Sequence, residues 1–342
     1  MIKELNVLRI FFMLFIFLEH SAYMEGGGYL GVALFFILGG FCMMLGYGEK
    51  VQSESFSYRK YLVRRLTKFY PFHWICLVAW VVMTLASQLP IGGIGELLAN
   101  VCLVQSWIPQ SKFYFSFNGI SWYLSNTVFY TVVFPFFARQ ILYRTRSRNV
   151  LFVLCLTAFY VLVCVLTPED KRHAILYIHP LVRLADFVLG CYLAKAFVWL
   201  RGRIHTFDAS KMVMGYVTSI VSIVLLIMQL RWCKDCLQFS CIFWPLASVT
   251  IMSTALASAY RQDRDSRFLE TASRIGGYSF YFYMVHQMAI QVCNSIAHKV
   301  HFEYHFTVMI VTLLISSLIA VACRKWIDEK IQNKLKTLGA YE

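Results

Sequence analysis

The sequence is poor in charged side chains, and poorest in acidic ones. Charged residues make up 15% of its 342 residues, whereas hydrophobic residues make up 59%. Soluble domains are about one quarter charged and about half apolar. The shortage of charge therefore excludes an ordinary soluble domain. It predicts an all-α fold, specifically a polytopic membrane helical bundle.

The chain also lacks a Pro-, Gly- or Ser-rich linker, a low-complexity segment and a convincing internal repeat. Its longest loops are about 30 residues, which is too short to build a separate hydrophobic core. We therefore expect residues 1–342 to form a single membrane domain with no appended soluble domain.

Ten apolar stretches are long enough to cross a bilayer, for which a helix needs about 20 residues. The first is expected to be retained rather than removed as a signal peptide, because Glu19 and His20 interrupt its apolar end. Another stretch, 94–107, is short and contains Glu96, so it is expected to be re-entrant or interfacial. The ten predicted crossings are residues 5–22, 30–47, 69–89, 120–142, 150–166, 175–200, 212–230, 240–260, 275–297 and 306–323.

Basic residues outnumber acidic ones by 32 to 18, which gives a formal net charge of +14. They gather in loops on one side of the ten crossings, which is the positive-inside pattern of membrane proteins and argues against a nucleic-acid partner. An eleventh crossing at 94–107 would place basic loops on both sides. We therefore expect about ten transmembrane helices, both termini in the cytoplasm, and a multi-pass protein of the cell membrane, as in a bacterial inner membrane.

The cysteines give little indication of a metal site. Most of the eleven lie singly in apolar stretches, where Cys behaves as a small hydrophobic residue. Cys233, Cys236 and Cys241 lie close together, but a zinc site would need a fourth ligand and usually a second such pair. We predict no metal ion. Ordinary thiols and a disulfide on an oxidising side both remain open.

The first predicted helix carries ionisable residues that a bilayer helix normally excludes. Arg9 and His20 are eleven positions apart, about three helical turns, so they share one face and lie about 16 Å apart along the axis. An ionisable group within a bilayer costs about 2.5–3.5 kcal/mol on insertion scales and therefore marks a functional site. The expected topology places Arg9 at the cytoplasmic end and His20 towards the far side.

A basic cluster of Arg64, Arg65 and Lys68 precedes the third crossing, and Arg64 and Lys68 share a helical face. Such cations can fix the topology by contacting anionic lipid. They can also hold the phosphates of a cytoplasmic ligand, for which Arg offers a bidentate fork. Charge alone favours the role in topology.

Polar residues within later crossings are further candidates. His286 lies mid-span, so it is either a hydrogen-bonding residue between helices or a member of a site. Ser279 and Tyr283 add polar groups to the same span. His73, at the start of the third crossing, is expected to be an interfacial residue, with ligand contact as the alternative.

Arg183 and Asp186 are three residues apart in the sixth crossing. This spacing suits an intramembrane salt bridge that neutralises both charges. We expect a structural pair, with substrate contact as the alternative.

Five motifs, in chain order, resemble those of the membrane-bound acyltransferase-3 family. Together they cover almost the whole chain, and their ordered combination is more specific than any one of them. They are Arg9 and His20 as R-x10-H, YLGVALFFILGGF (29–41), RRLTKFYP (64–71), SWYLSNTVFYTVVFP (121–135) and GGYSFYFYMVH (276–286).

The chain departs from the family pattern at three places. Gly39 replaces the usual Ser, and Lys68 replaces an Arg, which keeps the charge but loses the bidentate fork. The fourth motif, which begins at Trp122, has Asn126 and Thr127 where the family often has a glutamate. The function of that glutamate is therefore performed differently here or is not needed.

The resemblance implies an O-acyltransferase that moves an acyl group, most often acetyl, from acyl-coenzyme A to a hydroxyl. It implies acetyl-CoA as a co-substrate, no permanently bound cofactor, and an acceptor that is a cell-surface carbohydrate or a lipid-linked sugar. We predict His20 as the general base on that hydroxyl, with Glu19 in support. The predicted donor-binding residues are Arg9, Arg64, Arg65 and Lys68, and the possible further site members are His286, Ser279, Tyr283, Trp122, Asn126 and His73.

A membrane transporter for lipid-linked sugars or acyl compounds is the alternative function. Intramembrane Arg, Asp and His residues are also typical of carriers. The missing repeated half and the clustering of cations at one entrance favour the enzyme.

Overall fold

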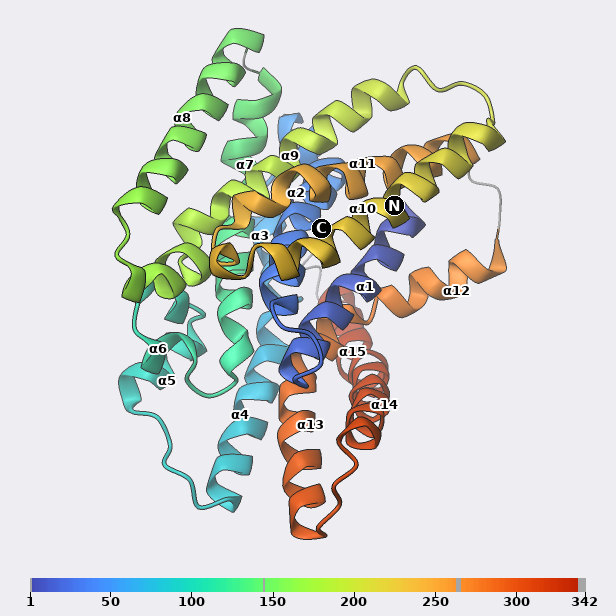
Figure 1. Ribbon diagram of the computed structural model, residues 1–342. Coiled ribbons are helices and arrows are strands. Elements are labelled where there is room, and N and C mark those ends of the chain that lie inside the picture. The colour runs from blue at the N-terminus through green and yellow to red at the C-terminus, as the bar shows by residue number, and fades with distance from the viewer. Residues whose placement is uncertain (1, 144, 263–265, 338–342) are drawn as a thin grey trace.

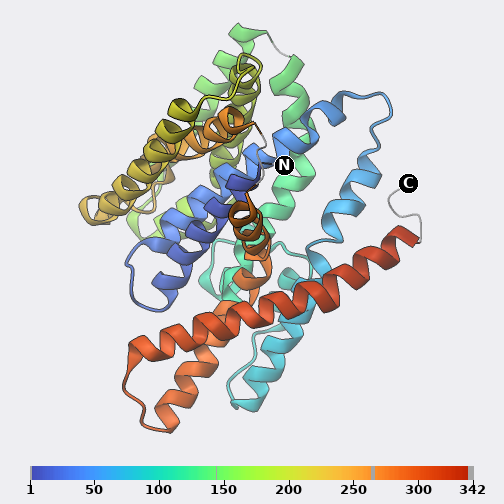
Figure 2. The same ribbon diagram turned by 90° about the vertical axis from the view of Figure 1, so that its right-hand side faces the viewer.

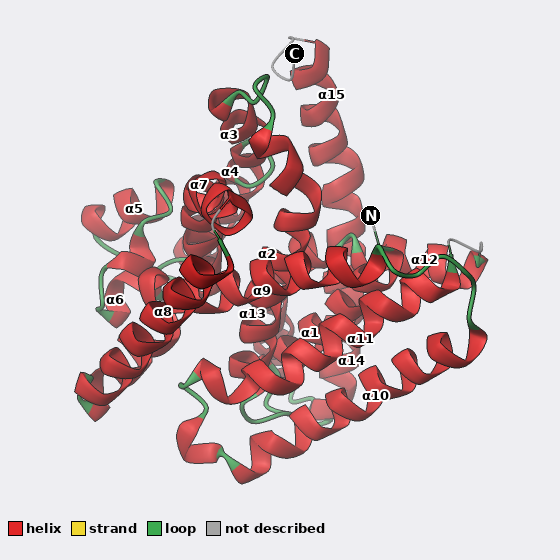
Figure 3. Ribbon diagram, turned by 90° about the horizontal axis from the view of Figure 1, so that it is seen from above, coloured by secondary structure: helices red, strands yellow, loops and turns green. Residues whose placement is uncertain are grey.

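The computed structural model describes residues 2–143, 145–262 and 266–337, and its regular secondary structure in these ranges is entirely helical (Figures 1 and 3). The prediction of an all-α membrane helical bundle is confirmed. The principal helices are α1 (Lys3–His20), α2 (Gly27–Gln52), α3 (Tyr58–Leu66), α4 (Tyr70–Ala86), α5 (Ile94–Val101), α6 (Ser111–Tyr114), α7 (Trp122–Tyr143), α8 (Arg146–Leu166), α9 (Pro180–Arg201), α10 (Ala209–Trp232), α11 (Trp244–Arg261), α12 (Arg267–Gly276), α13 (Ser279–Lys299), α14 (His305–Cys323) and α15 (Glu329–Thr337). Short 3-10 or π segments include η1 (Gln105–Trp107), η2 (Gly119–Ser121), η4 (His173–Ile178) and η7 (Arg324–Asp328).

Six helical segments in the described ranges are long and apolar enough to cross a membrane. They are Gly27–Gln52, Tyr58–Ala86, Ser147–Leu166, Ala209–Trp232, Ser240–Arg261 and His305–Lys334. The other four predicted crossings correspond to α1, α7, α9 and α13, which carry more polar or ionisable residues. The count of ten crossings and the cytoplasmic placement of both termini therefore stay predictions.

Helices differ sharply in how much of their surface the bundle covers. The apolar window of α2 is 72% buried, whereas that of α8 is only 11% buried, so α8 presents its apolar side chains to the surroundings. Figure 2 shows α14, η7 and α15 continuing as one long rod along the side of the bundle. The polar candidates Arg183, Asp186 and His286 are buried in the interior, where a partner helix replaces lipid.

The contact between α2 and α9 forms the centre of the bundle, and two glycines make it possible. A methyl group on Gly190 would lie 1.8 Å from the carbonyl oxygen of Ile37, and one on Gly40 would lie 1.9 Å from that of Phe187. Because no side chain fits there, the two backbones touch, as small residues allow in membrane helix packing.

Helix α1 is fixed at its first turn by a buried ion pair. Glu4 Oε1 accepts hydrogen bonds from Arg261 Nε at 2.9 Å and from the Tyr216 hydroxyl at 3.0 Å. These contacts tie α1 to α10 and α11. The stretch 94–107 forms α5, which at eight residues rises only about 12 Å, together with η1.

Candidate functional site

Two histidines from opposite ends of the sequence form the centre of the site. His20 is the last residue of α1, and its Nδ1 lies 2.8 Å from Nε2 of His286 on α13. Their rings are nearly parallel, at 10°, with centroids 5.1 Å apart. His286 is only 1% exposed, whereas His20 is partly exposed. One imidazole is therefore accessible, and the other supports it from behind.

The hydrogen bonds assign the protons of this pair. His286 Nδ1 lies 2.7 Å from the carbonyl oxygen of Tyr283, which can only accept, so this nitrogen donates. A neutral imidazole carries a single N–H, so His286 Nε2 accepts and His20 Nδ1 donates to it. The Nε2 atom of His20 is then left with its lone pair, as a base requires.

Aromatic rings hold the histidine pair in place. The Phe282 ring stacks on the His286 ring at 5.7 Å with an angle of 10°, and Phe17 contacts both rings edge-on. Phe17, three residues before His20, thereby brings the end of α1 against α13. This packing orients the His286 imidazole, which in turn contacts His20.

Glu19 faces away from the imidazole of its neighbour His20. Its carboxylate accepts the backbone N–H of Gly28 in the first turn of α2. A carboxylate at a helix N-terminus is favoured by the helix dipole. Glu19 therefore fixes the turn between α1 and α2, and its predicted support of His20 would act through that turn.

A cavity of about 1200 Å³ lies between the helices and is lined by residues of the loops and helix ends that we predict to be cytoplasmic, together with residues deeper in the bundle. Three of the four predicted donor-binding residues line it, namely Arg9, Arg65 and Lys68. Arg64 is exposed and does not line it. Four more basic residues among the described lining residues, which sequence reasoning assigned to topology or left unassigned, are Lys3, Arg201, Arg274 and Arg324.

The charge of this cavity is strongly one-sided. Among its described lining residues, seven are basic and only Glu270 is acidic. The sequence already indicated this positive charge, because most of these cations lie in the loops on the predicted cytoplasmic side. Their convergence on one space could not be read from it, because they come from α1, α3, α9, α12, the loop after α3 and η7.

Individual contacts orient two of these cations. Arg9 donates to Asn6 Oδ1 at 2.7 Å, and Asn6 donates in turn to the Ser273 hydroxyl on α12 at 3.0 Å. The Arg65 guanidinium lies over the Tyr47 ring at 5.6 Å, and its buried Nε has no hydrogen-bond partner. Both arginines are therefore positioned by neighbours, and Arg65 keeps a donor unused.

The cavity does not extend to the histidines, since His20 and His286 are not among its lining residues. Tyr123 lines its inner end and packs against the Tyr283 ring, with centroids 5.2 Å apart. Tyr283 in turn contacts His286 at 5.7 Å and donates its hydroxyl to the Ile120 carbonyl at 2.8 Å. These two tyrosines separate the cavity from the histidine pair.

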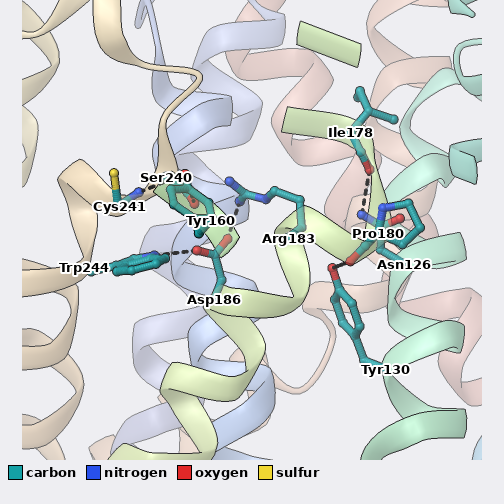
Figure 4. A network of polar contacts seen from close by, with 10 residues as sticks. All are labelled: Asn126, Tyr130, Tyr160, Ile178, Pro180, Arg183, Asp186, Ser240, Cys241 and Trp244. Atoms are coloured by element: carbon teal, nitrogen blue, oxygen red, sulfur yellow. Dashed lines mark hydrogen bonds and ion pairs between the residues drawn. The ribbon is translucent and has the colours of Figure 1, made fainter. Parts of the chain in front are cut away.

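The Arg183–Asp186 pair lies deep in the bundle (Figure 4). Arg183 Nη2 is 3.0 Å from Asp186 Oδ2, close but not aligned as a hydrogen bond, and both side chains are at most 1% exposed. The Trp244 indole N–H donates to Asp186 Oδ1 at 2.6 Å, and the guanidinium lies over the Phe36 ring at 5.2 Å. Such surroundings fit a structural role.

Asn126 lies in the same region and donates a hydrogen bond to the backbone just before α9 (Figure 4). Its Nδ2 donates to the Ile178 carbonyl at 2.9 Å, and the Tyr130 hydroxyl donates to the Pro180 carbonyl at 3.2 Å. These bonds satisfy carbonyls where η4 meets the start of α9, a junction that breaks regular helix bonding.

The remaining candidates take up other positions. His73 is fully buried and lies 2.8 Å from the Asn100 carbonyl, so it contacts the last turn of α5. Trp122 is buried against the Tyr177 ring at 4.9 Å. Ser279 begins α13. Cys233, Cys236 and Cys241 are all free thiols, and within the described ranges no group of three or more His, Cys, Asp or Glu side chains is placed to hold a metal ion.

Comparison with known proteins agrees with the motifs. A family model described as an acyltransferase domain matches residues 2–323. The O-acetyltransferase OatA of Staphylococcus aureus is 24% identical over 351 aligned residues, which include 96% of this chain and 57% of that protein. The acyltransferase MdmB of Streptomyces mycarofaciens is 28% identical over 285 residues, covering 77% of this chain and 68% of MdmB. This chain thus spans little more than half the length of OatA, and no solved structure matches it.

Proposed function

We propose, from the premise that this chain belongs to the acyltransferase-3 family, that it is an integral membrane O-acyltransferase of the cell membrane. It moves an acyl group, acetyl by analogy with the name of OatA, from cytoplasmic acyl-CoA to a hydroxyl of a cell-surface carbohydrate or lipid-linked sugar. One observation carries this proposal. A single helix, α1, bears Arg9 in a basic cavity and His20 in a histidine pair about 16 Å further along.

The basic cavity is the proposed donor site. Coenzyme A carries a diphosphate and a 3′-phosphate at one end of a long flexible arm, with the thioester at the other end. Seven cations against one acid suit such a polyanion, and Arg65 offers a guanidinium that can bind phosphate in bidentate fashion. The arm then follows α1 from Arg9 towards His20.

The contact between Tyr123 and Tyr283 lies on this route. Because it separates the cavity from the histidines, the two rings have to move apart before the thioester reaches His20. We place a gating step here, of the kind in which a side-chain layer opens when the donor is bound.

His20 is the proposed general base. Its Nε2 removes the proton from the acceptor hydroxyl, and the oxygen attacks the thioester carbonyl carbon. The resulting tetrahedral adduct collapses with breakage of the carbon–sulfur bond, and the leaving thiolate takes the proton back from His20. Base catalysis of this type is worth about 10²- to 10⁴-fold.

His286 is the proposed positioning residue for His20. By accepting the Nδ1–H of His20 it fixes the tautomer that leaves Nε2 free, and it stabilises the imidazolium that forms during the reaction. A carboxylate does this in Ser-His-Asp triads, whereas here a neutral imidazole anchored on a backbone carbonyl does so.

The experiment that tests the proposal uses His20→Ala in proteoliposomes supplied with radiolabelled acetyl-CoA and membranes from the parent cell. Transfer of label to glycan is expected to stop, while equilibrium binding of acetyl-CoA persists. His298→Ala, an exposed histidine on α13, is the matched control and should transfer normally. Retained transfer by His20→Ala would refute the assignment of the base. Uptake of the acyl compound without transfer by the wild-type protein would instead support a carrier.

A further inference from the structure

Aromatic side chains form two layers beyond the far-side end of α1. The front layer consists of Tyr29, Phe115 and His173, with Phe115 46% exposed and the other two partly exposed. The His173 ring lies 5.6 Å from Phe115 and 6.3 Å from Tyr29. Behind them Tyr114 and Tyr177 are buried. The back layer supports the front one, so the front rings are held in place.

This aromatic layer adjoins the histidine pair on one side through the turn between α1 and α2. Glu19, next to His20, binds the N–H of Gly28, and Tyr29 is the following residue. A methyl group placed on Gly28 would lie 3.6 Å from the Tyr177 hydroxyl, so this turn packs directly on the back layer.

The layer adjoins the pair on the other side through the loop before α7. A methyl group on Gly119 would lie 4.0 Å from the Phe115 ring and 3.7 Å from Gln287 Oε1. Gln287 directly follows His286 on α13. A series of neighbours therefore leads from His20 through Glu19, Gly28 and Tyr29 to His173 and Phe115. From there it leads to Gln287, which follows His286, the hydrogen-bond partner of His20.

Two amide oxygens near the aromatic layer have no hydrogen-bond partner. They are Gln287 Oε1 and Asn118 Oδ1, and Asn118 is fully buried with its Nδ2 donating to the Met284 carbonyl at 3.0 Å. An amide oxygen can only accept, so what it lacks is a donor. A buried acceptor without a donor is unfavourable, and a ligand hydroxyl would relieve it.

We propose that Tyr29, Phe115, His173 and Gln287 form the subsite on which the sugar of the proposed acceptor packs. This inference rests on the proposed acyltransferase function. Fixed aromatic faces suit the C–H faces of a pyranose, and a few convergent acceptors suit its hydroxyls. Tyr29 follows Gly28, which is bonded to the neighbour of His20, and Gln287 follows His286, so we place the acceptor hydroxyl of a sugar held here at His20 Nε2.

The subsite is tested with Phe115→Ala and Gln287→Ala in cells that lack the native gene. Ester-linked acetate on surface glycans is measured by mass spectrometry, and acetyl-CoA binding is measured on each purified variant. Both variants are expected to lose at least tenfold in glycan acetate while acetyl-CoA binding stays as in the wild type. Phe115→Trp, which keeps an aromatic face, should restore most of the acetate. Tyr304→Ala, which removes an exposed aromatic residue between α13 and α14, is the matched control.

Each outcome decides between the subsite and its rivals. Wild-type acetate in both alanine variants would overturn the subsite, and so would loss of acetyl-CoA binding in parallel with acetate, which indicates a structural role. Equal loss in Phe115→Trp and Phe115→Ala would also count against a stacking role. Absence of glycan acetate in cells with the wild-type gene would instead reject the proposed function itself.

Discussion

The histidine pair gives the prediction that tests the site most directly, and it concerns His286 rather than the proposed base, His20. The change is His286→Phe, which keeps a flat ring on Phe282 and Phe17 but removes the acceptor for the Nδ1–H of His20. The His20 imidazole then loses the bond that fixes both its tautomer and its orientation. Binding of acyl-CoA is expected to be unaffected, because the cavity does not include this residue.

The magnitude follows from the bond that is lost. A hydrogen bond of this kind contributes about 0.5–1.5 kcal/mol, and leaving a partner buried and unsatisfied costs about 1–3 kcal/mol. Because about 1.4 kcal/mol changes a rate tenfold, kcat is expected to fall about 10- to 100-fold. The loss is smaller than the 10²- to 10⁴-fold contribution of a general base, since His20 remains present.

The assay measures release of coenzyme A thiol from acetyl-CoA in proteoliposomes that contain the acceptor, which gives kcat and the donor KM separately. His286→Gln is the conservative variant, because its amide oxygen can still accept from His20, and we expect it to recover part of kcat. Wild-type kcat in His286→Phe would refute the positioning role. A Gln variant as slow as the Phe variant, with the same donor KM, would refute the hydrogen-bond explanation.

Two further predictions test the cavity and the central helix crossing. Arg65→Ala removes a charge-assisted bond worth about 1.5–3 kcal/mol and should raise the KM for acetyl-CoA about 10- to 100-fold in titrations, whereas the exposed neighbour variant Arg64→Ala should raise it far less. Equal effects would argue against the cavity as the donor site. Gly190→Ala places a methyl group 1.8 Å from the Ile37 carbonyl oxygen and should lower the melting temperature in detergent, whereas Gly39→Ala meets nothing within 4 Å and should not. Unchanged melting of Gly190→Ala would contradict the close contact.

The candidate site was only partly accessible to sequence reasoning. The spacing of Arg9 and His20 on α1 depends on one helical period, so the sequence could predict their shared face. The distances between helices depend on packing between distant segments. Sequence reasoning identified His286 but could not pair it with His20, 266 positions earlier in the chain. Its proposal that Glu19 supports His20 stays a prediction, and only the structure shows that the Glu19 carboxylate accepts the Gly28 N–H.

The basic residues also show which features the sequence predicts and which depend on tertiary packing. Their bias to one side was visible in the order of loops, because charge and hydropathy are local properties of the chain. Which of them share a cavity was not visible, since Arg201 and Arg324 reach it from helices far apart in sequence, whereas Arg64 is excluded although it adjoins Arg65.

The sequence by itself determined the helical class and the membrane character, because both follow from local composition and periodicity. Its ordered motifs indicated the family, and the helical period predicted that Arg9 and His20 share one face of α1. Tertiary structure alone decided that Gly40 and Gly190 bring α2 and α9 into backbone contact. It also decided which nitrogen of His20 donates to His286 and which keeps its lone pair. That choice depends on a carbonyl of another helix, and only the folded chain brings the two together.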